Sequence, residues 1–253
     1  MESTKIKPLD VLSESQLSEI RKKNDLRNIF ALLFDWGLMV LGLYVFYYYP
    51  SILTFLASVV VIGSRQFALA VLAHDGAHNL LFSNSKINDF ISQWFCAYPI
   101  FQDNRVYRPY HLKHHRFTET EEDPDLILSA PFPINKKSFF RKVVRDLTGV
   151  TGYRRYSSSL VSIFKTEGDN SSEKISRIWN KIHGFFIVNL VIFILISSFF
   201  HWSLFFLLWW LPAFTYYSLI IRIRNIAEHC VTPGESDFNN TRTTRASFLM
   251  RFL

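Results

Sequence analysis

Five of the chain's eight histidines fall in two short clusters whose spacing predicts a metal site. His74 and His78 are four residues apart, so they share one face of a helix. His111, His114 and His115 have i, i+3, i+4 spacing, which again predicts one helical face. Neutral imidazole is the commonest nitrogen ligand of borderline transition metals, and five imidazoles exceed the needs of one tetrahedral zinc. The pattern therefore indicates a site for two metal ions.

Four apolar segments around these clusters have the length of about 20 residues that a membrane-spanning helix needs. They run over about 29–48, 51–73, 182–200 and 202–223. Short turns join the first segment to the second and the third to the fourth, so we expect two membrane hairpins. Both turns lack Lys and Arg, which crowd the opposite ends. By the positive-inside rule, both termini and the histidine clusters then lie in the cytoplasm.

The composition also favours a membrane protein. Of 253 residues, 49% are hydrophobic and 17% aromatic, while only 19% are charged, below the level of ordinary soluble domains. The net charge of +7 is explained by loops that face anionic membrane lipid. No groove-reading motif is present, so we expect no nucleic-acid partner.

The expected fold class is an all-α integral membrane protein, with four transmembrane helices in two hairpins and a cytosolic helical cap that carries the histidines. We expect a cytosolic N-terminal segment over 1–28 and one domain over 29–253, whose cap comprises 74–181 and 224–253. An apolar piece at about 87–101 is too short to cross the bilayer and is predicted to be an interfacial or re-entrant helix. The polar stretch 123–180 is predicted to form loops and short helices.

A sixth histidine is predicted to join the site because of where its helix ends. His74 lies about 35 Å along a helix from Ser51, and His229 lies about 40 Å from Trp202. Both helices start on the outer side, so they deliver the two histidines to similar heights.

Two charges within the first hairpin are expected to pair. Asp35 and Arg65 each lie more than about 10 Å inside their spans, and charges at such depth usually face inward and find a partner. We predict an Asp35–Arg65 ion pair, with Gln66 as a further member. The alternative is that Arg65 reaches toward an acyl carboxylate or headgroup.

The segments HDGAHNLLF and YHLKHHRFT resemble the first two histidine boxes of membrane fatty acid desaturases. The stretches EEDPDL and RNIAEH are also similar to that family, and the resemblance covers about Ile29 to Leu253. It implies a di-iron centre that uses O2 as co-substrate. By position, the implied metal ligands are His74, His78, His111, His114, His115 and His229. The candidate carboxylates that orient these imidazoles are Asp75, Asp123, Asp125 and Glu228.

One family element is missing from the resemblance. The family has a further HxxHH-like box on the C-terminal side, and no histidine follows His229 in this sequence. We expect the chain to be C-terminally incomplete, and therefore to hold only part of the ligand set.

The resemblance implies an oxidoreductase of lipid metabolism that introduces a double bond into a fatty acyl chain. No cytochrome b5 module and no nucleotide fingerprint are found, so an external electron donor, a ferredoxin or a cytochrome b5-like protein, is implied. Two alternatives stay open. A lipid hydroxylase or a carotenoid ketolase or hydroxylase would use the same site, and a membrane metal-binding protein would use it without catalysis.

Overall fold

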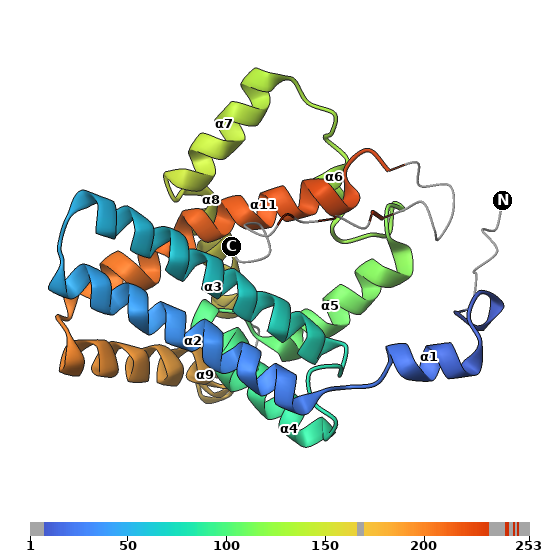
Figure 1. Cartoon of the computed structure of the whole chain (residues 1–253), viewed down its shortest axis with the longest axis horizontal. Helices are drawn as coiled ribbons and strands as arrows, with labels where there is room; N and C mark the ends of the chain where they lie inside the picture. The colour runs from blue at the N-terminus through green and yellow to red at the C-terminus, as the bar shows by residue number, and fades with distance from the viewer. Residues whose placement is uncertain (1–7, 166–169, 233–240, 243–244, 246, 248–253) are drawn as a thin grey trace.

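The computed structural model describes residues 8–165, 170–232, 241–242, 245 and 247, and every regular element in them is helical. Figure 1 shows the arrangement. The elements in chain order are η1 (Pro8–Asp10), α1 (Glu14–Ile20), α2 (Asp25–Tyr48), α3 (Ile52–Ala77), α4 (Ser85–Ile91), η2 (Ser92–Ala97), η3 (Tyr98–Ile100), α5 (Asn104–Phe117), α6 (Leu126–Ser129), α7 (Lys136–Leu147), α8 (Val150–Phe164), α9 (Ser171–Phe199), η4 (Phe205–Trp210), α10 (Leu211–Phe214) and α11 (Tyr216–His229).

Within the described residues, four helical segments are long and apolar enough to cross a membrane, and they form the two predicted hairpins. The first hairpin joins α2 to α3, and the second joins α9 to the run from η4 to α11. The rings of Tyr47 and Phe200 lie 5.5 Å apart, so both hairpin turns are at the same end of the molecule. The all-α membrane architecture is therefore confirmed.

The turn of the first hairpin is defined by its local chemistry. Pro50 separates the helices because its ring cannot continue the hydrogen-bond ladder of α2. Ser51 then caps α3, since its Oγ accepts from Thr54 N at 3.1 Å while Thr54 Oγ1 accepts from Ser51 N at 3.0 Å. This reciprocal capping pattern satisfies backbone donors that the first turn would leave unpaired.

The spanning helices extend beyond the apolar segments that predicted them, as α9 and α3 show. The third span begins at Ser171, where Asn170 Oδ1 accepts from Glu173 N at 2.8 Å, instead of at residue 182. The second span continues to Ala77, past the predicted end at residue 73. Hydropathy locates the membrane-buried part of a helix, whereas capping residues decide where the helix ends. Because of the longer α3, His74 lies on a regular helical turn.

The fourth span is interrupted. The π-helical η4 is followed by Pro212, which has no backbone N–H to donate. Gln66 on α3 donates to the carbonyl of Trp209 at 2.8 Å, so a neighbouring span satisfies this carbonyl. The chain then resumes as α11, which ends at His229.

The apolar piece after the first histidine cluster folds as three short helices, α4, η2 and η3. Its second half is core: Cys96, Ala97, Tyr98, Pro99 and Ile100 are all buried. It packs against α3 so closely that a Cβ at Gly76 would overlap the Ser92 side chain. The predicted helix therefore forms part of the protein interior over this half.

The cap segment after α6 contains two amphipathic helices, α7 and α8, of 12 and 15 residues. Figure 1 shows α7 projecting away from α2, α3 and α9. It is fastened to α11 by the fully buried Asp146, whose Oδ1 accepts from Arg222 Nη2 at 2.8 Å. The helix α8 packs on α10, where Gly152 meets the backbone of Phe214.

Candidate metal centre

Four histidines converge where the end of α3 meets α5. One ring nitrogen from each of His74, His78, His111 and His115 lies within 4.8 Å of the others. The Nε2 atom of His111 is 3.0 Å from His78 Nε2 and 2.9 Å from His115 Nε2. We call this set the four-histidine cluster. Imidazole nitrogens this close aim at a common point, as ligands of one metal ion do.

The environment of the cluster favours neutral imidazoles. The pKa of His111 is lowered to about 2, mainly by burial and next by the nearby His74. The pKa of His115 is lowered to about 4, again mainly by burial and next by the nearby His78. Both groups are therefore neutral near pH 7, which is the form of imidazole that binds metals.

The third histidine of α5, His114, lies beside these two but contacts a different helix. The ring of His114 lies 4.9 Å from the ring of His229 at the end of α11. At 100° per residue, His115 returns to within about 40° of His111, whereas His114 lies about 60° away on the other side. The three histidines thus share one side of α5, with the ring of His114 at 5.9 Å from that of His111 and 5.6 Å from that of His115. Within this face, His111 and His115 lie toward the histidines of α3, and His114 lies toward His229.

Asp123 holds His114 in position. Its Oδ1 lies 2.8 Å from His114 Nδ1, and its two oxygens also accept from the backbone N–H groups of Glu119 and Asp125 at 2.8 Å each. Burial raises the pKa of Asp123, but these hydrogen bonds outweigh burial and hold it below its usual range. An ionised carboxylate only accepts, so His114 donates from Nδ1, which leaves its Nε2 lone pair free.

Two further predicted carboxylates lie near the histidines with weaker contacts. Asp75 Oδ1 is 3.3 Å from His74 Nδ1, on a partly exposed side chain. Asp125 Oδ2 is 3.8 Å from His114 Nδ1, beyond hydrogen-bonding distance, and Asp125 Oδ1 accepts from Tyr110 Oη at 2.5 Å.

The remaining predicted carboxylate, Glu228, is committed to another partner. Its Oε1 accepts from Arg224 Nε at 2.8 Å, one turn earlier on α11, while its Oε2 is 4.0 Å from His229 Nε2. His229 Nδ1 is buried and has no hydrogen-bond partner in the part of the chain that the structure describes. A buried ring nitrogen without a hydrogen-bond partner is unusual in a protein. This nitrogen is therefore available to coordinate a metal ion.

The residues present fit a transition metal. Four imidazoles converge, the neighbouring His114 is oriented by a buried carboxylate, and the buried Nδ1 of His229 lacks a partner among the described residues. Such nitrogen-rich sets suit iron, zinc or copper, whereas magnesium and calcium prefer oxygen ligands.

The structure adds a residue that the motif reasoning missed. Tyr107 stacks on His111 with ring centroids 4.9 Å apart and ring planes 11° apart. Its position one helical turn before His111 was the available signal. The helix α5 is also tied to α3 by Asn104, whose Nδ2 donates to the carbonyl of Ala73 at 2.8 Å. The stack and this bond hold the second histidine group against the first.

Below the site, Arg65 Nη1 lies 3.1 Å from Asp35 Oδ1, and both side chains are buried. The two spans of the first hairpin are thus joined by the ion pair that the sequence predicted. Gln66 is not a further member, because its Nε2 donates to Trp209 and its Oε1 has no partner among the described residues.

Comparisons with known proteins agree with this geometry. The fatty acid desaturase family matches residues 50–253. A similar characterised protein is the dihydrorhizobitoxine desaturase of Bradyrhizobium elkanii, which is 41% identical over 71 residues. That alignment spans 27% of this chain and only 20% of the relative's length. Since the family match covers most of the sequence and the histidines of its first two boxes meet in space, the chain belongs to the fatty acid desaturase family.

Proposed function

We propose that this protein is an O2-dependent di-iron oxidoreductase that introduces a double bond into a fatty acyl chain. The observation that carries the proposal is the four-histidine cluster within a family-matched membrane fold. The residues that would hold the iron are His74, His78, His111, His114, His115 and His229. Iron bound there would supply the O2-dependent removal of hydrogen from an unactivated methylene, which acid–base side chains cannot achieve.

The chain's own residues prepare the site for that chemistry. The low pKa values of His111 and His115 keep their lone pairs available at neutral pH. Asp123 sets the tautomer of His114. Asp75, Asp125 and Glu228 are proposed as weaker orienting groups. The packed ring of Tyr107 covers one side of His111 and limits access of water.

Desaturation is favoured over hydroxylation by the similar protein, which is itself a desaturase. We further propose that residues 29–253 form one domain, and that both termini and the histidines lie on the cytoplasmic side. Lys and Arg are concentrated in the segments at the ends of the spans opposite the two hairpin turns, and the positive-inside rule assigns such segments to the cytoplasm. The electron donor is proposed to be a separate ferredoxin or cytochrome b5-like protein.

The proposal is tested by expressing the full-length protein in a host that lacks a comparable desaturase and analysing its fatty acids by mass spectrometry. The expected result is a new double bond that disappears in the His111→Ala variant. His183→Ala is the matched control, because that histidine lies on α9 with its Nδ1 at 3.0 Å from the Trp179 carbonyl. A hydroxylated or keto product would show that the protein is a hydroxylase or ketolase and would overturn the proposal of desaturation. An unchanged product in the His111 variant would reject the metal centre.

A further inference from the structure

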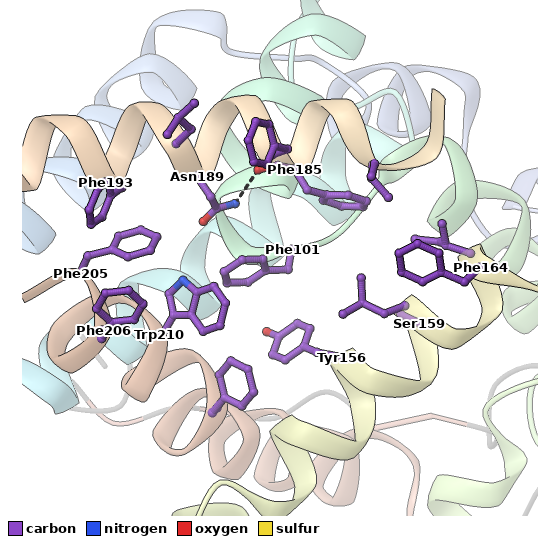
Figure 2. Close-up of a pocket in the computed structure, with 16 residues that line it drawn as sticks. Phe101, Tyr156, Ser159, Phe164, Phe185, Asn189, Phe193, Phe205, Phe206 and Trp210 are labelled. Carbon is purple, nitrogen blue, oxygen red and sulfur yellow. Dashed lines mark hydrogen bonds between the residues drawn. The ribbon is translucent and has the colours of Figure 1, made fainter. Parts of the chain in front are cut away.

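A cavity of about 590 Å³ lies between α8, α9 and the segment from η4 to α10 (Figure 2). Its volume is typical of sites that enclose a small molecule or a lipid chain. Sixteen residues line it, and all except Ser159 and Asn189 are aromatic or aliphatic. None of the six histidines of the candidate metal centre lines it. The cavity is therefore lined by residues other than those of the candidate metal centre.

Asn189 is the polar group that the cavity cannot satisfy. Its Nδ2 donates to the carbonyls of Tyr98 at 3.1 Å and Phe185 at 3.0 Å. Carbonyls only accept, so these two bonds fix the orientation of the amide and leave Oδ1 on the other side. Figure 2 shows the amide pointing from α9 into the cavity, toward the rings of Phe101 and Phe205.

The unpaired oxygen calls for a hydrogen-bond donor from outside the protein. Asn189 is only 8% exposed, and its Oδ1 has no partner among the described residues. Buried acceptors in folded proteins are nearly always paired, because an unpaired one loses its bonds to water. The side chain therefore marks one fixed point at which an otherwise apolar ligand presents a donor.

The position of the cavity indicates where this ligand comes from. The helices α9 and η4 belong to the third and fourth candidate membrane spans. Three of the lining side chains on these helices, Phe186, Leu190 and Phe206, are also exposed. Exposed apolar side chains on a spanning helix face the acyl chains of the bilayer. The cavity is therefore continuous with the surface that contacts lipid.

We propose that this cavity binds an aliphatic chain of a bilayer lipid that carries a hydroxyl group, which donates to Asn189 Oδ1. The eight phenylalanines of the lining pack against the methylene groups. An ammonium donor is disfavoured because no carboxylate lines the cavity to balance its charge. This inference goes beyond the proposed function, since it needs neither iron nor turnover.

The test measures equilibrium binding of radiolabelled 1-hexadecanol and hexadecyl methyl ether to the purified full chain in detergent. The two probes share the alkyl chain, but only the alcohol donates a hydrogen bond. We expect saturable binding that is roughly tenfold tighter for the alcohol, the effect of one buried hydrogen bond. In Asn189→Leu the two affinities should become equal. Equal affinities in the unsubstituted protein, or no saturable binding, would overturn the proposal.

A second variant is needed because Asn189→Leu also removes the bond to Tyr98 that joins α9 to η3. Ser159 is an exposed lining residue, so Ser159→Trp should fill the entrance and abolish binding of both probes. Val191→Trp is the matched control on an exposed part of α9 outside the lining. Equal loss in both tryptophan variants would overturn the proposal. Binding by His111→Ala should equal that of the unsubstituted protein, so failure of the metal centre and failure of the lipid site are distinguishable.

Discussion

The rings of His114 and His229 lie 4.9 Å apart at an interplanar angle of 77°, which joins α5 to the last residue of α11. The two residues are far apart in sequence, and no short motif contains both. Their contact brings the end of the fourth span to the histidines of the second box. The candidate centre therefore draws on both hairpins, and its geometry depends on the way the hairpins pack.

His229→Ala tests this contact. If His229 contributes a ligand, iron binding by the purified protein should weaken at least tenfold, since even changes in groups that only orient ligands cost about 10–100-fold. Iron per chain is measured by mass spectrometry after dialysis against a graded series of chelator concentrations. His201→Ala, in the turn at the opposite end, is the matched control. Identical iron retention in the two variants would place His229 outside the metal site.

Asp123→Asn tests the role of the buried carboxylate. The asparagine amide can donate from its Nδ2, so His114 is no longer held in the tautomer that carries its proton on Nδ1. The iron affinity should therefore fall about 10–100-fold. Glu122→Gln is the matched control, because Glu122 is the exposed neighbouring carboxylate. Chelator competition gives the affinities, and circular dichroism checks that helix content is kept. A similar affinity in both variants would show that Asp123 does not orient a ligand.

The Asp35–Arg65 pair should be costly to break and much cheaper to replace. Arg65→Met leaves a buried carboxylate without its partner, so the free energy of unfolding in detergent should fall by about 3–5 kcal/mol. The double variant Asp35→Leu/Arg65→Met should recover most of that loss, because apolar replacement of a buried pair is often neutral. Denaturant unfolding of both variants measures the coupling. Additive losses in the double variant would indicate that the two charges do not interact.

Replacing Gly152 by alanine is expected to destabilise the protein. An added Cβ would overlap the backbone of Phe214, which cannot move away as a flexible side chain would. Gly152→Ala should therefore cost about 1–3 kcal/mol through overpacking between α8 and α10. Gly37→Ala is the control, because a Cβ there meets nothing within 4 Å and alanine favours helix. Equal unfolding temperatures for the two variants would contradict the close packing of α8.

Much of this architecture follows from local sequence signals. The apolar segments predict the hairpins because spanning helices must be apolar over a fixed length. The i, i+4 spacing of His111 and His115 predicts their common direction, as does that of His74 and His78. The charged pair at Asp35 and Arg65 follows from the cost of leaving either group alone in lipid.

Other features depend on tertiary contacts that spacing cannot reveal. The partners of His114 are Asp123, from the loop after α5, and His229, from the end of α11. Glu228 looks like an orienting group by position, yet Arg224 one turn earlier takes its carboxylate. The amide of Asn189 reads in sequence as one polar residue in an apolar helix. Only the packing of η3 against α9 shows which of its two polar atoms is satisfied.

The Asp35–Arg65 bond also bears on how the chain enters the bilayer during synthesis. An isolated span with a single Asp or Arg near its centre loses about 2.5–3.5 kcal/mol of insertion free energy on the translocon scale. Because Arg65 Nη1 lies 3.1 Å from Asp35 Oδ1, each charge gains an oppositely charged partner once the neighbouring span is present. The first two spans are therefore expected to leave the translocon as a preassembled pair, with α2 retained there until α3 has been made.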